Sequence, residues 1–174
     1  MPRGHKGVRP CPGRSVARAE AVRLAKRIHA LNVELAQNNT QLKNMIEQSE
    51  AAPLLEQTGL GPVTVAVAYA ARPHPGRVRS KAAFAALASV SPIPASSGNP
   101  TRYRLNRGGD RRLNRALHMA TVTRMAHDPE TRAYVARRKA QGRTTKEIRR
   151  CLKRYLARRI YRTLEALHAA QGGT

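Results

Sequence analysis

Residues 145–169 read TKEIRRCLKRYLARRIYRTLEALHA. Apolar side chains recur in this segment every three or four positions, as one face of an α-helix requires, and the other faces are rich in arginine. Thr144 or Thr145 is suited to cap the start of the helix, and the pattern ends near Ala169. The predicted buried face consists of Ile148, Leu152, Tyr155, Leu156, Ile160, Leu164 and Leu167.

The rest of the composition also favours helices. The chain of 174 residues has one Phe, five Tyr and no Trp, so its core must come from Leu, Val, Ile and Ala. Residues suited to cap or open further helices are Ser80, Asp110 and the pair Asp128-Pro129. We therefore predict an all-α fold, in which a long heptad helix precedes a compact helical domain.

The long helix is predicted from Val16 to about Glu50. Its heptad seam alternates spacings of three and four and has one polar member, Asn38. Two interpretations remain open: a helix packed on its own domain, or a coiled coil that makes the protein a homo-oligomer. The predicted organisation is a disordered leader over 1–15, a coiled-coil-like helix over 16–52 and a helical DNA-binding domain over 53–170. The seam residues are Ala21, Leu24, Ile28, Leu31, Leu35, Asn38, Leu42 and Met45.

A glycine turn follows the long helix. Gly59-Leu60-Gly61 separates a short helical segment from an apolar helix that Pro62 opens. This arrangement is typical of a helix-hairpin-helix element, whose turn amides hold a DNA phosphate. A plain turn between helices is the alternative, and the sequence leaves both open for Gly59 and Gly61.

The charge of the chain points to an anionic polymer as its partner. There are 33 Lys and Arg against 10 Asp and Glu, and residues 99–174 hold twenty of the basic and five of the acidic residues. Nucleic acid, DNA above all, fits such an excess. No apolar run approaches the roughly 20 residues that span a bilayer, so we expect no membrane insertion. Cys11 and Cys151 lie far apart, which suits a reducing, cytoplasmic setting.

The sequence lacks the residue clusters that metal-dependent chemistry requires. The two aspartates occupy cap positions, the eight glutamates form no cluster, and no HExxH, CxxC or GxxxxGK[ST] motif is present. We therefore expect no metal site in this chain. One nucleophilic arrangement remains, Ser96-Ser97-Gly98 in a proline-rich loop, since a serine hydroxyl can attack a phosphodiester when nearby cations neutralise the developing charge. The cations that follow are Arg102, Arg104 and Arg107.

Two longer stretches carry a family resemblance. Residues 84–98 read FAALASVSPIPASSG and residues 104–118 read RLNRGGDRRLNRALH. Together with DPETRAY at 128–134 and CLKRYLAR at 151–158, they resemble the C-terminal domain of transposases of the insertion sequence 110 and 1111 elements. The similarity extends over about residues 20–167.

The resemblance implies a role in DNA transposition or site-specific recombination. It assigns the nucleophile to Ser97, with the neighbouring Ser96 as the alternative, and some members of the family also bind a structured guide RNA. Family members carry magnesium on an acidic N-terminal domain, so this chain is expected to lack a cofactor and, as a truncated fragment, to be inactive alone. The alternative is a basic DNA- or RNA-binding accessory protein without chemistry. The expected DNA contacts are Gly59, Gly61, Arg102, Arg104, Arg107, Arg111, Arg112 and Arg115.

Overall fold

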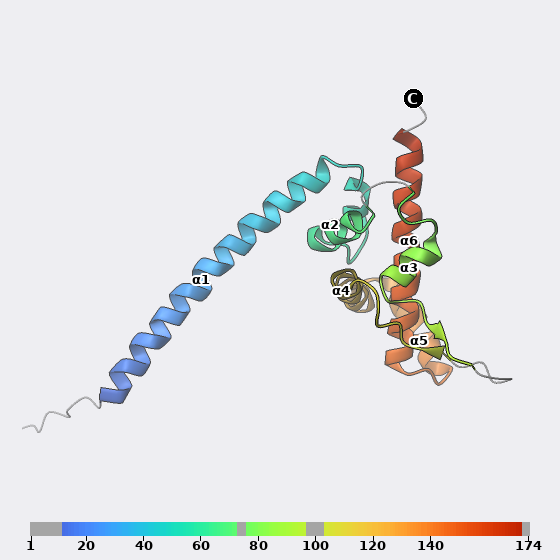
Figure 1. Ribbon diagram of the computed structural model, residues 1–174. Coiled ribbons are helices and arrows are strands. Elements are labelled where there is room, and N and C mark those ends of the chain that lie inside the picture. Colours follow the sequence, from blue (N-terminus) through green and yellow to red (C-terminus); the bar gives the residue numbers. More distant parts are fainter. Residues whose placement is uncertain (1–11, 73–75, 97–102, 172–174) are drawn as a thin grey trace, which may run out of the picture. The chain divides into compact units, whose positions relative to one another are not determined.

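A computed structural model describes residues 12–72, 76–96 and 103–171, and it confirms the predicted all-α class. The chain divides into two compact units, Met1–Gln41 and Leu42–Thr174. Figure 1 shows the helices in chain order, with one short two-stranded sheet among the described residues. None of the described helices is long and apolar enough to cross a membrane.

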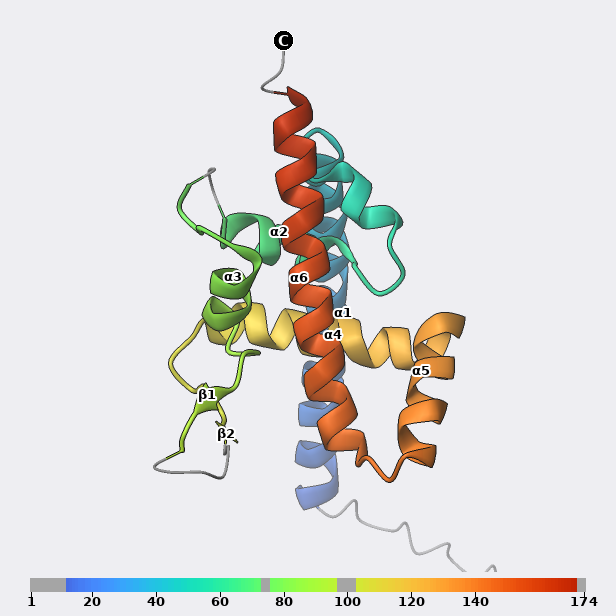
Figure 2. The ribbon, with the colours of Figure 1, turned by 90° about the vertical axis from the view of Figure 1, so that its right-hand side faces the viewer.

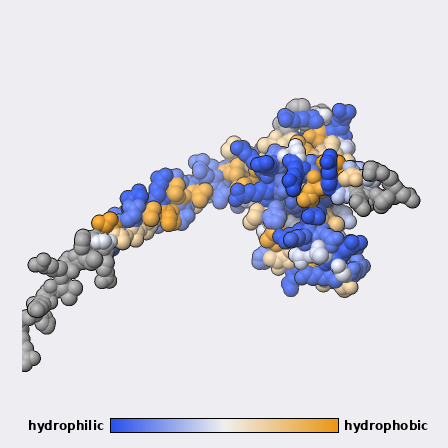
Figure 3. Space-filling view, turned by 60° about the horizontal axis from the view of Figure 1, so that its bottom comes forward, coloured by the Kyte–Doolittle hydropathy of each residue, from blue (hydrophilic) through white to orange (hydrophobic). Residues whose placement is uncertain are grey.

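The first helix, α1, extends from Pro12 to Glu47. It begins four residues before the predicted start at Val16, because proline fits the first turn of a helix, where its missing N–H is not needed. Residues 12–15 of the expected disordered leader are thus helical, and residues 1–11 lie outside the described part. The seam side chains of Leu24, Ile28, Leu31 and Leu35 are between 38% and 60% exposed, and Figure 3 shows hydrophobic residues on the surface along α1. Whether they join a coiled coil stays a prediction.

The second unit contains the remaining elements. A 3₁₀ helix, η1 (Ala52–Glu56), and a helix, α2 (Pro62–Ala70), flank the glycine turn, and α3 (Lys81–Leu87) follows. A hairpin of β1 (Ile93–Pro94) and β2 (Tyr103–Arg104) leads to α4 (Arg111–His127), α5 (Pro129–Ala140) and α6 (Thr145–Gln171). Figure 2 shows α6 in the middle of this unit, with α3 and the hairpin on one side and α5 on the other.

The predicted helix caps are confirmed. The Ser80 hydroxyl accepts a hydrogen bond from the Ala83 amide, and the carboxylates of Asp110 and Asp128 accept from amides in the first turns of α4 and α5. Thr144, rather than Thr145, caps α6 and forms a capping box with Glu147, in which each residue accepts a hydrogen bond from the other's backbone amide.

The apolar face of α6 supplies the centre of the core. Ile148, Leu156, Ile160 and Leu164 are buried, as predicted, and the last three belong to the core that α6 shares with α3 and α4. Tyr155 was predicted to be buried, and this is wrong, because the buried stripe continues through Ala157 and Tyr161 instead. Tyr155 is 56% exposed and meets the ring of Tyr134 edge-on, with centroids 6.2 Å apart. Leu152 and Leu167 are only partly buried.

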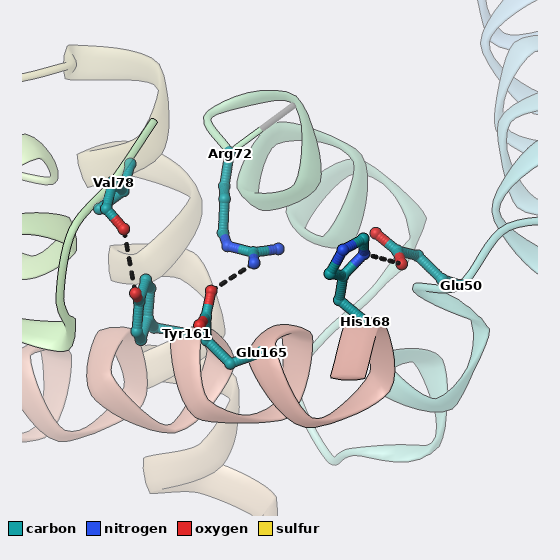
Figure 4. Close-up of polar contacts among 6 residues, drawn as sticks. All are labelled: Glu50, Arg72, Val78, Tyr161, Glu165 and His168. Atoms are coloured by element: carbon teal, nitrogen blue, oxygen red, sulfur yellow. Dashed lines mark hydrogen bonds and ion pairs between the residues drawn. The ribbon is translucent and has the colours of Figure 1, made fainter. Parts of the chain in front are cut away.

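A buried arginine fastens α2 to α6 (Figure 4). The side chain of Arg72, 1% exposed, pairs with the Glu165 carboxylate and lies over the ring of Tyr161, 5.8 Å from its centroid. The Tyr161 hydroxyl in turn donates to the Val78 carbonyl oxygen at 3.0 Å. The carboxylate and the aromatic face compensate part of the cost of burying the cation, and Nε of Arg72 has no hydrogen-bond partner among the described residues.

Candidate nucleic-acid interface

The two candidate serines follow β1 in the sequence. Ile93 pairs with Arg104 and Pro94 with Tyr103 in an antiparallel ladder. A two-stranded ladder has only edge strands, so Pro94 removes no interior hydrogen bond. Ser96 is exposed just beyond β1, while Ser97 and Arg102 lie outside the described residues.

The base of the hairpin is fixed to the end of α3. The Ala86 carbonyl oxygen accepts from Asn106 Nδ2 at 2.9 Å, and the Leu87 oxygen accepts from the Asp110 amide at 2.7 Å. The Ala88 oxygen accepts from Asn114 Nδ2 at 2.7 Å. Three consecutive carbonyls at the end of α3 are therefore satisfied by the segment 106–114, which we call the clasp.

Glycine is required in the clasp at residue 109. A Cβ on Gly109 would lie 2.2 Å from the Leu87 carbonyl oxygen and 2.5 Å from Oγ of Ser89. Ser89 itself has a left-handed backbone, with φ of 56°, and its hydroxyl oxygen accepts from the Gly109 amide at 2.9 Å. The close approach fixes the path of the chain from the hairpin into α4.

A basic groove lies between the hairpin and the N-terminal half of α6. Its larger part has a volume of about 680 Å³, and an adjoining hollow of about 460 Å³ shares four lining residues with it. Among the described residues that line the two parts there is one carboxylate, Glu147. The lining cations are Arg107, Arg111, Arg115, Arg138, Arg143, Arg150, Lys153 and Arg154, joined by His118.

The one carboxylate does little to neutralise this groove. Hydrogen bonds from Thr144 hold the pKa of Glu147 below its usual value, with smaller contributions from Arg143 and Arg150. Its oxygens are thus committed to the cap of α6 and to an ion pair with Arg143 at 3.6 Å. The groove keeps a positive potential that favours an anionic ligand.

Two protonatable groups that line the groove, Lys153 and His118, have lowered pKa values. Burial, and then the cations Arg150 and Arg149, lower the pKa of Lys153, whose Nζ donates to Asn114 Oδ1 at 3.0 Å. Burial, and then Lys153 and Arg149, lower the pKa of His118. Both shifts are costs that a bound anion would relieve, because opposite charge favours the protonated form.

The expected DNA contacts divide into two sets. Arg107, Arg111 and Arg115 line the groove together, whereas Arg104 and Arg112 are exposed elsewhere on the surface. The cations of α5 and α6 were absent from the predicted site. The i, i+3, i+4 spacing of Arg150, Lys153 and Arg154 was the available signal, since it sets them on one helix face.

The glycine turn lies against α4. Gly59 has φ of +83°, and a Cβ there would lie 2.8 Å from the Ala120 carbonyl oxygen. Nη1 of Arg124 donates to the Thr58 carbonyl oxygen at 3.0 Å. Gly61 precedes α2 without a side-chain cap. Gly59 thus has a packing role, and phosphate binding by this turn stays a prediction.

Magnesium, which the resemblance implies for complete family proteins, has no fitting ligand set in the described part of the chain. No group of three His, Cys, Asp or Glu residues there could hold a metal ion. Asp128 is committed to the cap of α5 and to Arg124, and the hydrogen bond from the Thr131 hydroxyl is the main cause of its lowered pKa. We derive no chemical step through a metal.

Comparison with known proteins identifies the class. A sequence model described as the transposase IS116/IS110/IS902 family matches residues 51–136. An insertion element IS900 uncharacterized 42 kDa protein of Mycobacterium paratuberculosis is 28% identical over 140 residues, which cover 75% of this chain and 34% of that protein. An insertion element IS110 uncharacterized 43.6 kDa protein of Streptomyces coelicolor is 28% identical over 123 residues, which cover 70% of this chain and 30% of that protein.

The chain therefore contains a transposase region. That region, which includes the hairpin, the clasp and α4, belongs to the IS116/IS110/IS902 family. The chain spans about a third of the length of the curated relatives it matches.

Proposed function

We propose that this chain binds the DNA of an insertion element through the basic groove and contributes a serine nucleophile to its transposition. The observation that carries the proposal is the groove itself, in which eight lysine and arginine residues gather beside the hairpin that leads to Ser96 and Ser97. Cations so placed hold phosphates and neutralise charge that develops during phosphoryl transfer.

The proposed nucleophile is Ser97, with Ser96 as the alternative. In the proposed step the serine oxygen bonds to phosphorus as the bond from phosphorus to a sugar oxygen breaks. The serine gives up its proton, and the departing sugar oxygen takes one up. The product is a covalent link between protein and DNA, which is a measurable signature.

The decisive experiment searches for that link. The chain is incubated with DNA from the end of an insertion element and a full-length relative whose matching serine is replaced by alanine, so that only this chain supplies the hydroxyl. We expect an adduct that survives denaturation and is lost in Ser97→Ala, with DNA affinity unchanged within a few-fold. Loss in Ser96→Ala alone would move the assignment by one residue, and retention in both variants would contradict the serine mechanism.

A binding role without chemistry is the second candidate, and the same groove supports it. In that case Arg150→Gln and Arg154→Gln weaken DNA binding, yet no adduct forms with any variant. A structured RNA is another ligand that this charge would take, so the binding assay includes one.

We further propose that the exposed seam of α1 joins copies of the protein. Its support is the heptad spacing together with the exposure of four of its apolar side chains.

A further inference from the structure

The two walls of the basic groove differ in chemistry. The wall formed by the hairpin and its base carries four apolar side chains, Val90, Pro92, Tyr103 and Leu105, beside Ser89, Ser91, Asn106 and Arg107. Tyr103 is 62% and Leu105 52% exposed. The opposite wall, from α5 to the start of α6, carries Arg138, Arg143, Arg150 and Arg154.

An unpaired nucleic-acid strand has two sides whose chemistry matches the two walls of the groove. Its phosphates follow one side and its base faces are free on the other, so that bases can stack on aromatic side chains while cations follow the backbone. A duplex hides its base faces in the stack and would leave the Tyr103 wall without a partner. The larger part of the groove, about 680 Å³, is wide enough to enclose a small ligand, since such pockets measure ~300–1,000 Å³.

The two asparagines among the described residues that line the groove are already engaged in hydrogen bonds within the protein. Asn106 donates to the Ala86 carbonyl oxygen and accepts from the Gly108 amide. Asn114 donates to the Ala88 carbonyl oxygen and accepts from Lys153. Asparagine reads adenine through these same amide atoms. Binding through stacking and charge alone tolerates any sequence.

We propose that the groove binds a short unpaired stretch of DNA, with its bases against Tyr103 and Leu105 and its phosphates on the cations of α5 and α6. This rests on the proposed function, which assigns the nucleophile to the segment that follows β1 in the sequence.

A single tryptophan can report on stacking, because the chain has none of its own. In Tyr103→Trp, the twelve-nucleotide strand dT12 should quench the fluorescence saturably, and a blunt twelve-base-pair duplex should not. Met119→Trp is the matched control, because Met119 is similarly exposed, at 54%, on α4 outside the groove lining. Quenching in the control equal to that in Tyr103→Trp would overturn the proposal.

Affinities measured by fluorescence anisotropy complete the test. Tyr103→Ala and Leu105→Ala should each weaken dT12 binding roughly tenfold, with the salt slope unchanged because no charge is lost. Tyr103→Phe should bind dT12 with an affinity within about twofold of the wild type, because phenylalanine keeps the aromatic ring. Met119→Ala should also bind within about twofold, because Met119 lies outside the groove lining. Circular dichroism verifies that each variant is folded, and Leu105→Ala serves as the readout if Tyr103→Ala opens the hairpin.

The remaining outcomes separate this inference from the proposed function. The duplex could bind at least as tightly as dT12, with an affinity that Tyr103→Ala leaves unchanged and Arg150→Gln weakens. This result would overturn the proposal that the strand is unpaired and would leave the proposal of DNA binding by the groove intact. Affinity for U12 RNA or for a polyglutamate peptide equal to that for dT12 overturns the assignment to DNA. If Arg150→Gln and Arg154→Gln weaken no nucleic-acid complex, the groove is not the binding site and both proposals fail.

Discussion

Gly109 illustrates how a single missing side chain can fix a functional segment. Its Cα hydrogens face the backbone of Leu87 and Ser89, which cannot yield as the end of a flexible side chain could. The clasp thereby brings its donors close enough to satisfy the end of α3. A motif that looks like a flexible Gly-Gly break in the sequence is a site of tight backbone contact in the structure.

We therefore expect Gly109→Ala to destabilise the second unit by roughly 1–3 kcal/mol or more, because the added Cβ overpacks backbone atoms. Urea unfolding followed by circular dichroism measures the change. Gly61→Ala is the matched control, since nothing lies within 4 Å of the position that a Cβ would take there and its φ of −76° suits alanine. Equal stability of the two variants would contradict the tight contact.

His118 should make stability depend on pH. Its pKa in the folded protein is lowered by burial, Lys153 and Arg149, so below the ordinary value of 6.5 the unfolded chain takes up the proton first. Stability is therefore complete above about pH 6.5 and is partly lost as the pH falls through the interval down to the folded pKa. His118→Gln should lose less stability than the wild type between pH 7.5 and 5. Parallel curves for the two proteins would show that His118 contributes nothing.

At the scale of elements, local sequence explains where most helices begin. Ser80, Asp110, Asp128 and Thr144 each accept amide hydrogen bonds at the start of a helix, and such caps depend on neighbours only three residues away. The buried face of α6 was predictable for the same reason, apart from Tyr155. Its ring meets Tyr134 of α5, and the helix pattern does not contain that contact.

The groove was less accessible to sequence reasoning because it is a tertiary feature. Arg107 is separated by more than forty residues from Arg150 and Arg154, and only the packing of the hairpin beside α6 brings them to one groove. Local charge density indicated a nucleic-acid surface but could not distinguish Arg111 from Arg112. Only Arg111 lines the groove. The roles of Ser96 and Ser97 remain predictions.

The seam of α1 yields a prediction about association. Leu31→Asp with Leu35→Asp should raise the dissociation constant of the oligomer by at least about 100-fold, because each copy would lose two buried leucines. Light scattering at tens of micromolar measures the assembly. Val33→Asp with Gln37→Asp adds the same charge away from the seam and should leave association nearly unchanged. A monomeric wild type, near 19.1 kDa, would contradict the coiled coil.

At the scale of the whole molecule, the formal net charge of +23 ensures that nucleic acid is attracted from many directions. Affinity alone therefore says little about where the ligand lies. The salt dependence is more informative, because each phosphate contact adds about 0.9 to the slope of log affinity against log salt for duplex DNA and about 0.7 for a single strand.

Arg111 and Arg112 offer a matched pair for this measurement. Both are exposed on the first turn of α4, but only Arg111 lines the groove. Arg111→Gln should lower the slope by nearly one, whereas Arg112→Gln should lower it by much less. Titrations between 50 and 200 mM salt would measure both. Equal reductions of the salt slope in the two variants would indicate that the DNA covers the whole exposed surface of α4 and is not confined to the groove.

The clasp also has a consequence for how this region could be altered. Its hydrogen bonds join residues 86–89 to residues 106–114, on either side of the hairpin, and none of them involves the connection between β1 and β2. These hydrogen bonds hold the two ends of the hairpin to one another. The connection could be exchanged for one of different length or chemistry while the supporting scaffold stays folded, which makes it a natural place for evolution, or an engineer, to install a new reactive group.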